Sequence, residues 1–176
     1  MRTDQDLMSA AADGDMDAFE ELVLHHQHAA VRVAYRLLSH EEDARDAAQE
    51  AFLRILESAS RYRPTASFRT YLYHILTRIC IDHLRRRSRR ERFDVTLTLD
   101  PSHAPPEALE RNERAERVRV AIRALPARQR VALVLKHYEG MSYAEIAEAM
   151  QTSRRAVDSM LARARQALKE MLADLL

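Results

Sequence analysis

The sequence has few of the residues that interrupt helices, with 2 glycines and 5 prolines among 176 residues, and it has no tryptophan. It is rich in alanine, leucine, arginine and glutamate, so an all-α fold is the first expectation. A single cysteine, Cys80, excludes an internal disulfide, and its place between Ile79 and Ile81 predicts a buried thiol. Because no apolar run approaches about 20 residues and no signal peptide is evident, we expect a cytoplasmic chain that is not membrane-inserted.

The net charge of +1 conceals two blocks of opposite sign. Residues 1–57 carry 5 Arg and Lys against 13 Asp and Glu, a net of −8, whereas residues 58–93 carry 10 Arg against 2 acids, a net of +8. The run 85–90 is arginine except for Ser88, and such a cluster repels itself unless phosphates or an acidic partner balance it. The blocks predict two different partners, one of them polyanionic. The alternative is that solvated helix faces merely carry blocks of charge.

The segment 142–165 has the pattern of a helix-turn-helix, with apolar residues at helical spacing on one face of a short helix and of a longer one. Ser142 and Glu145 form an S-x-x-E capping box, and Thr152 or Ser153 can cap the second helix. In this motif the second helix usually enters the major groove of DNA. The alternative is an ordinary helical hairpin in a bundle.

Helical patterns also fill the first half of the chain, where Asp15, Ser39 and Ser67 are expected N-caps and Glu42 is the capping-box partner of Ser39. The predicted helices are 4–12, about 15–38, about 39–57 and about 68–87.

The helical pattern stops at 94–106, which contains three prolines and favours an extended linker over a lone strand at 95–99. The sequence therefore predicts two small helical domains, 1–92 and 107–176, joined by a flexible linker, 93–106.

Both halves of the chain together resemble one family, the two-domain, extracytoplasmic-function type of bacterial sigma factor in the sigma-70 family. The similar runs are 43–54, 67–75 and 79–86 for sigma domain 2, and 124–130, 138–147 and 163–165 for sigma domain 4. The resemblance implies a promoter-specificity subunit that directs core RNA polymerase to −10/−35 promoters and starts transcription. It also implies control by an anti-sigma factor.

The resemblance implies that a D-x-x-Q-E helix docks on a coiled coil of the largest (beta-prime) polymerase subunit, and contact with the beta subunit is also expected. Asp46, Gln49 and Glu50 carry this motif, and Arg54 continues the same face. These polar positions lie opposite the apolar stripe and are available to a partner, although a solvated helix surface fits them equally well.

The next loop and helix are expected, from the resemblance, to melt the −10 promoter element and to hold one strand of it. Unstacked bases need aromatic platforms and a cationic groove, and a pocket for a flipped base is expected at 62–67. Phe68 and Tyr71 have a core position as their alternative, which is favoured for Tyr71. The expected −10 contacts are Arg61, Tyr62, Arg63, Phe68, Arg69, Arg78, Asp82, Arg85 and Arg86.

The resemblance assigns the −35 element to the helix after Thr152. Asp158 and Met160 stand where the family often has cations, but an aspartate can accept a hydrogen bond from cytosine N4. Gln151 stands where the turn often has glycine, and a left-handed residue there costs about 1 kcal/mol. The expected −35 contacts are Ser153, Arg154, Arg155, Asp158, Ser159 and Arg163.

Two other classes of function fit the sequence less well. A free-standing LuxR-like regulator would explain the helix-turn-helix but not the D-x-x-Q-E helix. An enzyme such as a nuclease would need a clustered, inward-facing pair of acids, which the helical pattern does not supply. His25, His26 and His28 lie on one helix without a cysteine or acid to complete a tetrahedral set, so we predict no metal, no cofactor and no small-molecule substrate.

Overall fold

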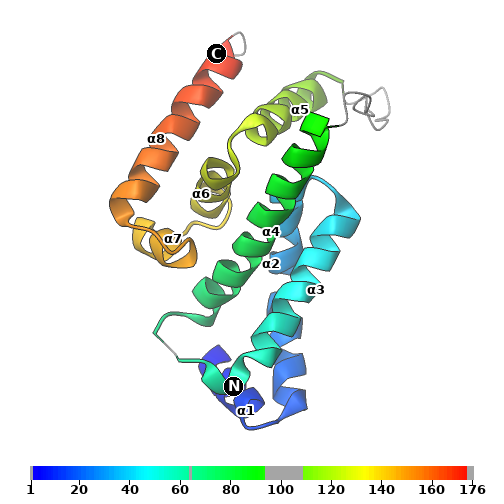
Figure 1. Cartoon of the computed structure of the whole chain (residues 1–176), viewed down its shortest axis with the longest axis vertical. Helices are drawn as coiled ribbons and strands as arrows, with labels where there is room; N and C mark the ends of the chain where they lie inside the picture. The colour runs from blue at the N-terminus through cyan, green and yellow to red at the C-terminus, as the bar shows by residue number, and fades with distance from the viewer. Residues whose placement is uncertain (1, 64, 94–108, 174–176) are drawn as a thin grey trace.

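A computed structural model describes residues 2–63, 65–93 and 109–173, which form helices joined by short turns (Figure 1). The all-α prediction is confirmed over these ranges. Beyond Phe93, the predicted linker and the possible strand at 95–99 lie outside the described residues. The helices are α1 (Asp4–Ala12), α2 (Met16–Leu38), α3 (Glu41–Glu57), the short 3₁₀ helix η1 (Ala59–Arg61), α4 (Phe68–Phe93), α5 (Leu109–Ala124), α6 (Ala127–His137), α7 (Tyr143–Ala149) and α8 (Arg154–Met171).

Side-chain caps fix most of the helix starts. The Asp15 carboxylate accepts from the amide of Ala18 at 3.0 Å, and the Ser67 hydroxyl accepts from the amide of Thr70 at 3.2 Å, so both predicted caps are confirmed. The prediction for Ser39 is wrong. Ser39 has a left-handed backbone (φ 58°, ψ 24°) that ends α2, whereas an N-cap has an extended backbone, and His40 takes that place at α3.

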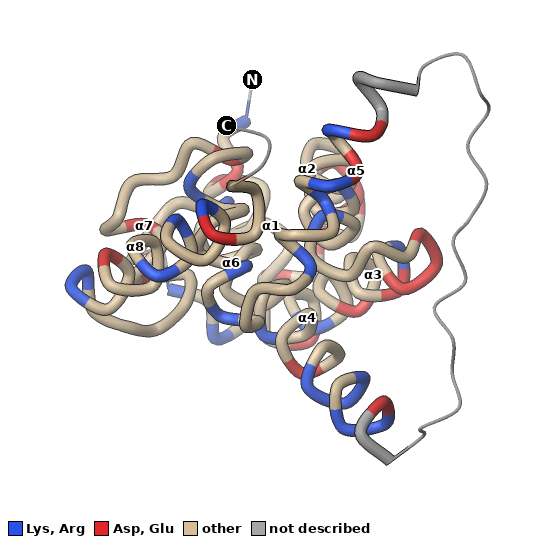
Figure 2. The backbone as a smooth tube through the Cα atoms, turned by 90° about the horizontal axis from the view of Figure 1, so that it is seen from above, with Lys and Arg blue, Asp and Glu red and all other residues tan. Residues whose placement is uncertain are grey.

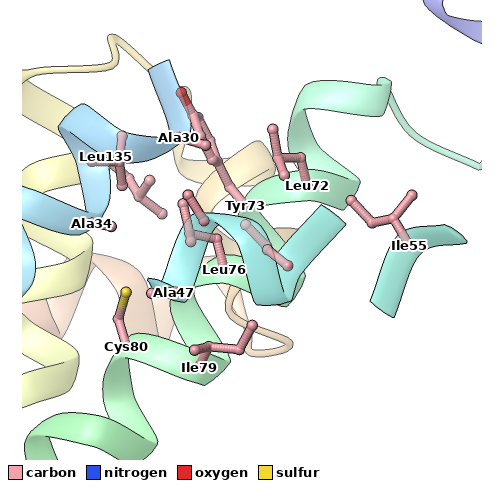
Figure 3. Close-up of a cluster of buried hydrophobic side chains, with 14 of the residues drawn as sticks. Ala30, Ala34, Ala47, Ile55, Leu72, Tyr73, Leu76, Ile79, Cys80 and Leu135 are labelled. Carbon is pink, nitrogen blue, oxygen red and sulfur yellow. The ribbon is translucent and has the colours of Figure 1, made fainter. Parts of the chain in front are cut away.

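Small side chains let the N-terminal helices pack closely. Ala34 of α2 and Ala47 of α3 are buried, and Figure 3 draws both in the cluster that also contains Leu72, Leu76 and Ile79 of α4. Cys80 lies in the same cluster and is fully buried, as the sequence predicted. Burial raises the pKa of its thiol to about 12, so the side chain is a core group rather than a nucleophile.

The C-terminal helices form the helix-turn-helix that the sequence predicted. Ser142 and Glu145 make the capping box of α7, and the Ser153 hydroxyl accepts from the amide of Ala156 at 3.1 Å to cap α8. Gln151 takes the left-handed conformation between them, with φ 46°. α8 packs on both α6 and α7, and α5 touches α8.

The two helical units pack against each other through α4. α6 and α7 contact α4 on the side away from α3, and α6 also contacts α2 (Figure 1). Leu135 of α6 is fully buried in the same apolar cluster as Tyr73 and Leu76 of α4 (Figure 3). The sequence predicted two domains joined by a flexible linker. The structure adds a direct contact between them, because the core of the N-terminal unit continues into the C-terminal one.

Candidate nucleic-acid interface

The outer side of α3 carries the predicted docking residues. Asp46, Gln49, Glu50 and Arg54 are all exposed, while Ala47, Ala48, Ala51 and Ile55 on the other side are buried. Glu50 and Arg54 form an ion pair within this surface. The arrangement follows from helical spacing, which sends the D-x-x-Q-E positions away from the apolar stripe.

Leu53 is a member of this surface that the motif did not reveal. Its side chain is 53% exposed, and it lies three and four residues after Glu50 and Gln49, on the same side of α3. An exposed leucine within a polar rim resembles the centre of a protein interface more than a solvated helix face. Its position off the buried stripe of α3 was the available sequence signal.

The aromatic residues of the predicted −10 segment pack on one another. The ring centroids of Tyr62 and Tyr71 are 5.0 Å apart, and Phe68 lies 5.0 Å from the imidazole of His26. Phe68 is only 2% exposed, so neither face of its ring is open to a base. Its expected role as a base platform is therefore wrong for this conformation, and the core alternative describes it.

Tyr62 is half-buried, and its hydroxyl has no hydrogen-bond partner among the described residues. Burial raises the pKa of its phenol. The Tyr71 hydroxyl is 2.9 Å from the Ser58 hydroxyl, which holds the ring against the loop. Arg61 and Arg63 flank Tyr62 and are exposed. This segment therefore offers two cations and one partly covered ring.

The far end of α4 is an open basic surface. Arg78, Asp82, Arg85 and Arg86 are exposed and follow one side of the helix, and Asp82 is the only acid among these four. α4 continues to Phe93, beyond the predicted end near Arg87, and Arg87 pairs with Glu91 at 2.9 Å in this extension. Figure 2 shows the arginines gathered where α4 projects from the other helices. A projecting cationic helix can follow a phosphate backbone.

Arg69, at the start of α4, has different surroundings. It donates to the backbone carbonyl of Glu139 and lies 3.3 Å from the carboxylate of the same residue. The Tyr73 hydroxyl donates to that carboxylate at 2.7 Å, and Arg36 of α2 lies 3.7 Å from its other oxygen. Burial and the hydrogen bond to Glu139 raise the pKa of Tyr73 to about 12. The C-terminal unit thus pairs with one of the predicted −10 residues, whose side chain stays 41% exposed.

The predicted −35 residues lie on the outer side of α8. Ser153, Arg154, Arg155, Asp158 and Arg163 are exposed and Ser159 is half-buried, whereas Val157, Leu161 and Ala164 face the core. Met160 is half-buried against the core cluster, so it is a packing residue rather than a lost cation. Three arginines and one aspartate are thus exposed along the helix that this motif presents to DNA.

The histidines form no metal cluster in the described part of the chain, where no three His, Cys, Asp or Glu side chains are arranged to hold an ion. His26 instead hydrogen-bonds to Asp4 at 2.8 Å, and His25 lies 3.7 Å from the same carboxylate. Among the described helices, none is long and apolar enough to cross a membrane.

Comparison with known proteins assigns both halves of the chain. Residues 22–90 match Sigma-70 region 2, and residues 115–168 match Sigma-70, region 4. The chain is 34% identical to the RNA polymerase sigma-H factor of Pseudomonas aeruginosa, over 98% of this chain and 95% of that protein. It is 32% identical to the ECF RNA polymerase sigma factor SigM of Mycobacterium tuberculosis, over 97% and 85% respectively.

Solved structures agree. CnrH, solved in complex with the cytosolic domain of CnrY, matches with a TM-score of 0.70 and 26% identity over 96% of both chains. The sigma factor RpoE of Bartonella quintana, solved with the anti-sigma factor NepR, shares the fold at a TM-score of 0.68 and 22% identity, over 88% of this chain and 96% of that one. The chain belongs to the extracytoplasmic-function (ECF) sigma factors of the sigma-70 family.

The function of the chain follows from its membership of this family. It binds core RNA polymerase and promoter DNA, directs the enzyme to −10/−35 promoters and starts transcription. The match over residues 22–90 decides against the LuxR-like alternative, in which the N-terminal half would be a sensing or dimerisation domain.

Proposed function

We propose that this sigma factor is an adaptor without chemistry of its own, which acts in the cytoplasm where polymerase and chromosome meet. In this proposal the exposed side of α3 docks on the beta-prime coiled coil. The observation that carries it is a polar surface of Asp46, Gln49, Glu50 and Arg54 around the exposed Leu53, opposite a fully packed helix face. A partner can displace water from such a surface without disturbing the core.

The test is the affinity of the full chain for core polymerase. Gln49→Ala with Glu50→Ala is expected to weaken binding about tenfold or more, because interface centres carry most of the binding energy. Gln166→Ala with Glu170→Ala is the matched control, since it removes an exposed Gln–Glu pair from α8. Equal affinity of the two double variants, with unchanged helicity, contradicts the docking assignment.

For the −10 element we propose the loop 61–67 and the exposed side of α4. Arg61, Tyr62 and Arg63 are assigned to the flipped base and its phosphates, and Arg78, Asp82, Arg85 and Arg86 to the adjoining duplex. Arg69, whose side chain is 41% exposed at the start of α4, completes the set. Exchanging loop 60–67 for that of another sigma factor is expected to change the −10 preference of the holoenzyme. An unaltered preference in a randomised promoter library contradicts this assignment.

For the −35 element we propose α8. Arg154 and Arg155 lie at its N-terminus, where base edges are usually contacted, and Asp158 follows one turn later. Asp158→Ala is expected to relax base selection at one −35 position, with an effect of about 1–3 kcal/mol if Asp158 accepts from a cytosine. A uniform change across all promoters assigns Asp158 to repulsion of phosphate instead.

We also propose that an anti-sigma protein controls the chain, as the sequence suggested. The support is the likeness over both domains to CnrH, which was solved in complex with a cytosolic partner domain. Run-off transcription by the reconstituted holoenzyme, with and without the candidate inhibitor, tests this. An inhibitor that binds the chain but leaves run-off unchanged contradicts it.

A further inference from the structure

A row of four aromatic rings runs from the loop assigned to the −10 element into the N-terminal core. The ring centroids of Tyr62 and Tyr71 are 5.0 Å apart, and those of Tyr71 and Phe68 are 6.4 Å apart. The Phe68 ring in turn lies 5.0 Å from the imidazole of His26. Each distance falls in the range of about 4.5–7 Å at which aromatic rings attract each other. The rings come from the loop, α4 and α2, so the row joins three separate segments.

The row ends on a carboxylate of α1. Nε2 of His26 lies 2.8 Å from a carboxylate oxygen of Asp4. Since a carboxylate accepts hydrogen bonds, Nε2 is the donor, and this bond holds the imidazole in one orientation. The His26 side chain is 16% exposed, whereas that of His25 is 43% exposed and lies 3.7 Å from the other Asp4 oxygen. His26 is therefore the histidine that joins Asp4 to Phe68.

α1 supports the loop although it precedes residues 22–90, which match Sigma-70 region 2. Leu7 and Met8 of α1 are fully buried in the same apolar cluster as Ala59 of η1, the short helix that leads into the loop. α1 also touches η1 directly. The loop therefore rests on α1 by two routes, through η1 and through the carboxylate of Asp4.

The Tyr62 ring has no polar anchor among the described residues, because its hydroxyl lacks a hydrogen-bond partner there. Its neighbour in the row is better fixed, since the Tyr71 hydroxyl lies 2.9 Å from that of Ser58. The position of Tyr62 is thus set by packing, and the Tyr71 ring links it to the rest of the row.

We propose that His26, held by Asp4, is a positioning residue for the −10 loop. It supports Phe68 and Tyr71, and through them it keeps the Tyr62 ring where an unstacked base can bind. The proposal rests on the assignment of this loop to the −10 element. A base platform that is already ordered loses less conformational freedom on binding, so its placement matters most in the step that unstacks the base.

The first test separates promoter binding from promoter opening in the reconstituted holoenzyme. The promoter carries 2-aminopurine in its −10 element, and the rise in fluorescence on unstacking gives the opening rate at increasing holoenzyme concentration. His26→Ala is expected to slow opening at saturation about fivefold to tenfold, the effect of one aromatic pair. The concentration that gives the half-maximal rate is expected to change by less than about twofold.

The matched control is His25→Ala, which removes an exposed imidazole beside the same carboxylate. This variant is expected to open the promoter as the wild type does. Equal opening rates of His25→Ala and His26→Ala overturn the proposal.

The second test distinguishes positioning from a general loss of folded protein. In a Tyr62→Ala background, His26→Ala is expected to slow opening by less than about twofold, because the ring that it positions is gone. Asp4→Ala is expected to slow opening as well, and Asp4→Asn to recover most of the loss, since its amide oxygen still accepts from the imidazole. A His26→Ala effect of the same size with and without the Tyr62 ring overturns the positioning role.

Arg61→Ala with Arg63→Ala tests the −10 assignment separately, because these exposed residues lie outside the row of rings. If this double variant slows opening and His26→Ala does not, the positioning role is overturned and the −10 assignment stands. If the double variant opens the promoter as the wild type does, the −10 assignment and the proposal that rests on it are both overturned.

Discussion

The two ends of α4 carry the same kind of side chain in different surroundings. At the start, Arg69 is half-buried and pairs with Glu139, whereas Arg85 and Arg86 near the far end are exposed and no partner is recorded for either among the described residues. The sequence makes both ends basic, and the domain that packs on α4 makes them differ. The availability of a cationic surface is thus decided by tertiary contacts and not by its charge.

The largest effect that sharpens this comparison is on stability. Phe68→Ala is expected to lower the free energy of unfolding by about 3–5 kcal/mol, because it removes a ring buried against His26 and Tyr71. Arg85→Ala with Arg86→Ala is expected to change it by less than about 1 kcal/mol, as exposed surface substitutions do. Urea unfolding of both variants measures the difference. A small loss of unfolding free energy in Phe68→Ala would contradict the core assignment and favour the expected role of this ring as a base platform.

The next effect is on DNA binding by the holoenzyme. Arg85→Ala with Arg86→Ala is expected to weaken promoter affinity about tenfold or more and to reduce the salt slope by about 2, because two phosphate contacts are lost. Filter binding at several salt concentrations measures both quantities. An unchanged slope means that this end of α4, although exposed, does not meet the phosphates.

A smaller effect is the pH dependence of stability that Tyr73 causes at the start of α4. Tyr73 has a pKa of about 12 against an ordinary value of 10.0, so the folded chain keeps a proton that the unfolded chain loses between these values. Stability is therefore expected to fall as the pH rises through this window, and Tyr73→Phe abolishes that part of the fall. Both are measured by urea unfolding in a Cys80→Ala background, because the buried thiol contributes in the same sense. Parallel pH curves with and without Tyr73 contradict the assignment.

The smallest effect concerns the turn of the helix-turn-helix. Gln151→Gly is expected to stabilise the chain by about 0.5–1 kcal/mol, since Gln151 has φ 46° and glycine adopts this conformation without strain. Gly140→Ala, at φ 65° beside Glu139, is expected to destabilise it by a similar amount. Thermal unfolding compares the pair. Shifts of the same sign contradict the backbone argument.

Local patterns predicted much of this molecule because local interactions create it. The capping box of Ser142 with Glu145 depends on residues three positions apart and is confirmed. Of the two candidates for the cap of α8, Thr152 and Ser153, the structure selects Ser153. Apolar spacing likewise placed the docking residues on the exposed side of α3. Ser39 was assigned wrongly because a serine between two helices fits either the end of one or the start of the next, and only the backbone angles distinguish these.

The contact between the two helical units could not be predicted from local patterns. Glu139 and Arg69 are 70 positions apart, and neither belongs to a periodic apolar pattern that would mark it as an interface residue. Arg130 is likewise only 9% exposed, although arginine is a residue type that is rarely buried. Phe68 was ambiguous for a related reason. A ring at the start of a helix fits a base platform or a core, and the partners that bury it come from distant helices.

The most direct test measures the distance between the two helical units in the free chain, with and without the Glu139 carboxylate. Spin labels at Asp17→Cys on α2 and Glu170→Cys on α8, in a Cys80→Ala background, lie on exposed positions outside the proposed interfaces. Double electron–electron resonance is expected to give one short distance for the free chain. Glu139→Lys is expected to populate longer distances, because a cation then faces Arg36 and Arg69. The same short distance in Glu139→Lys as in the wild-type chain would contradict the account.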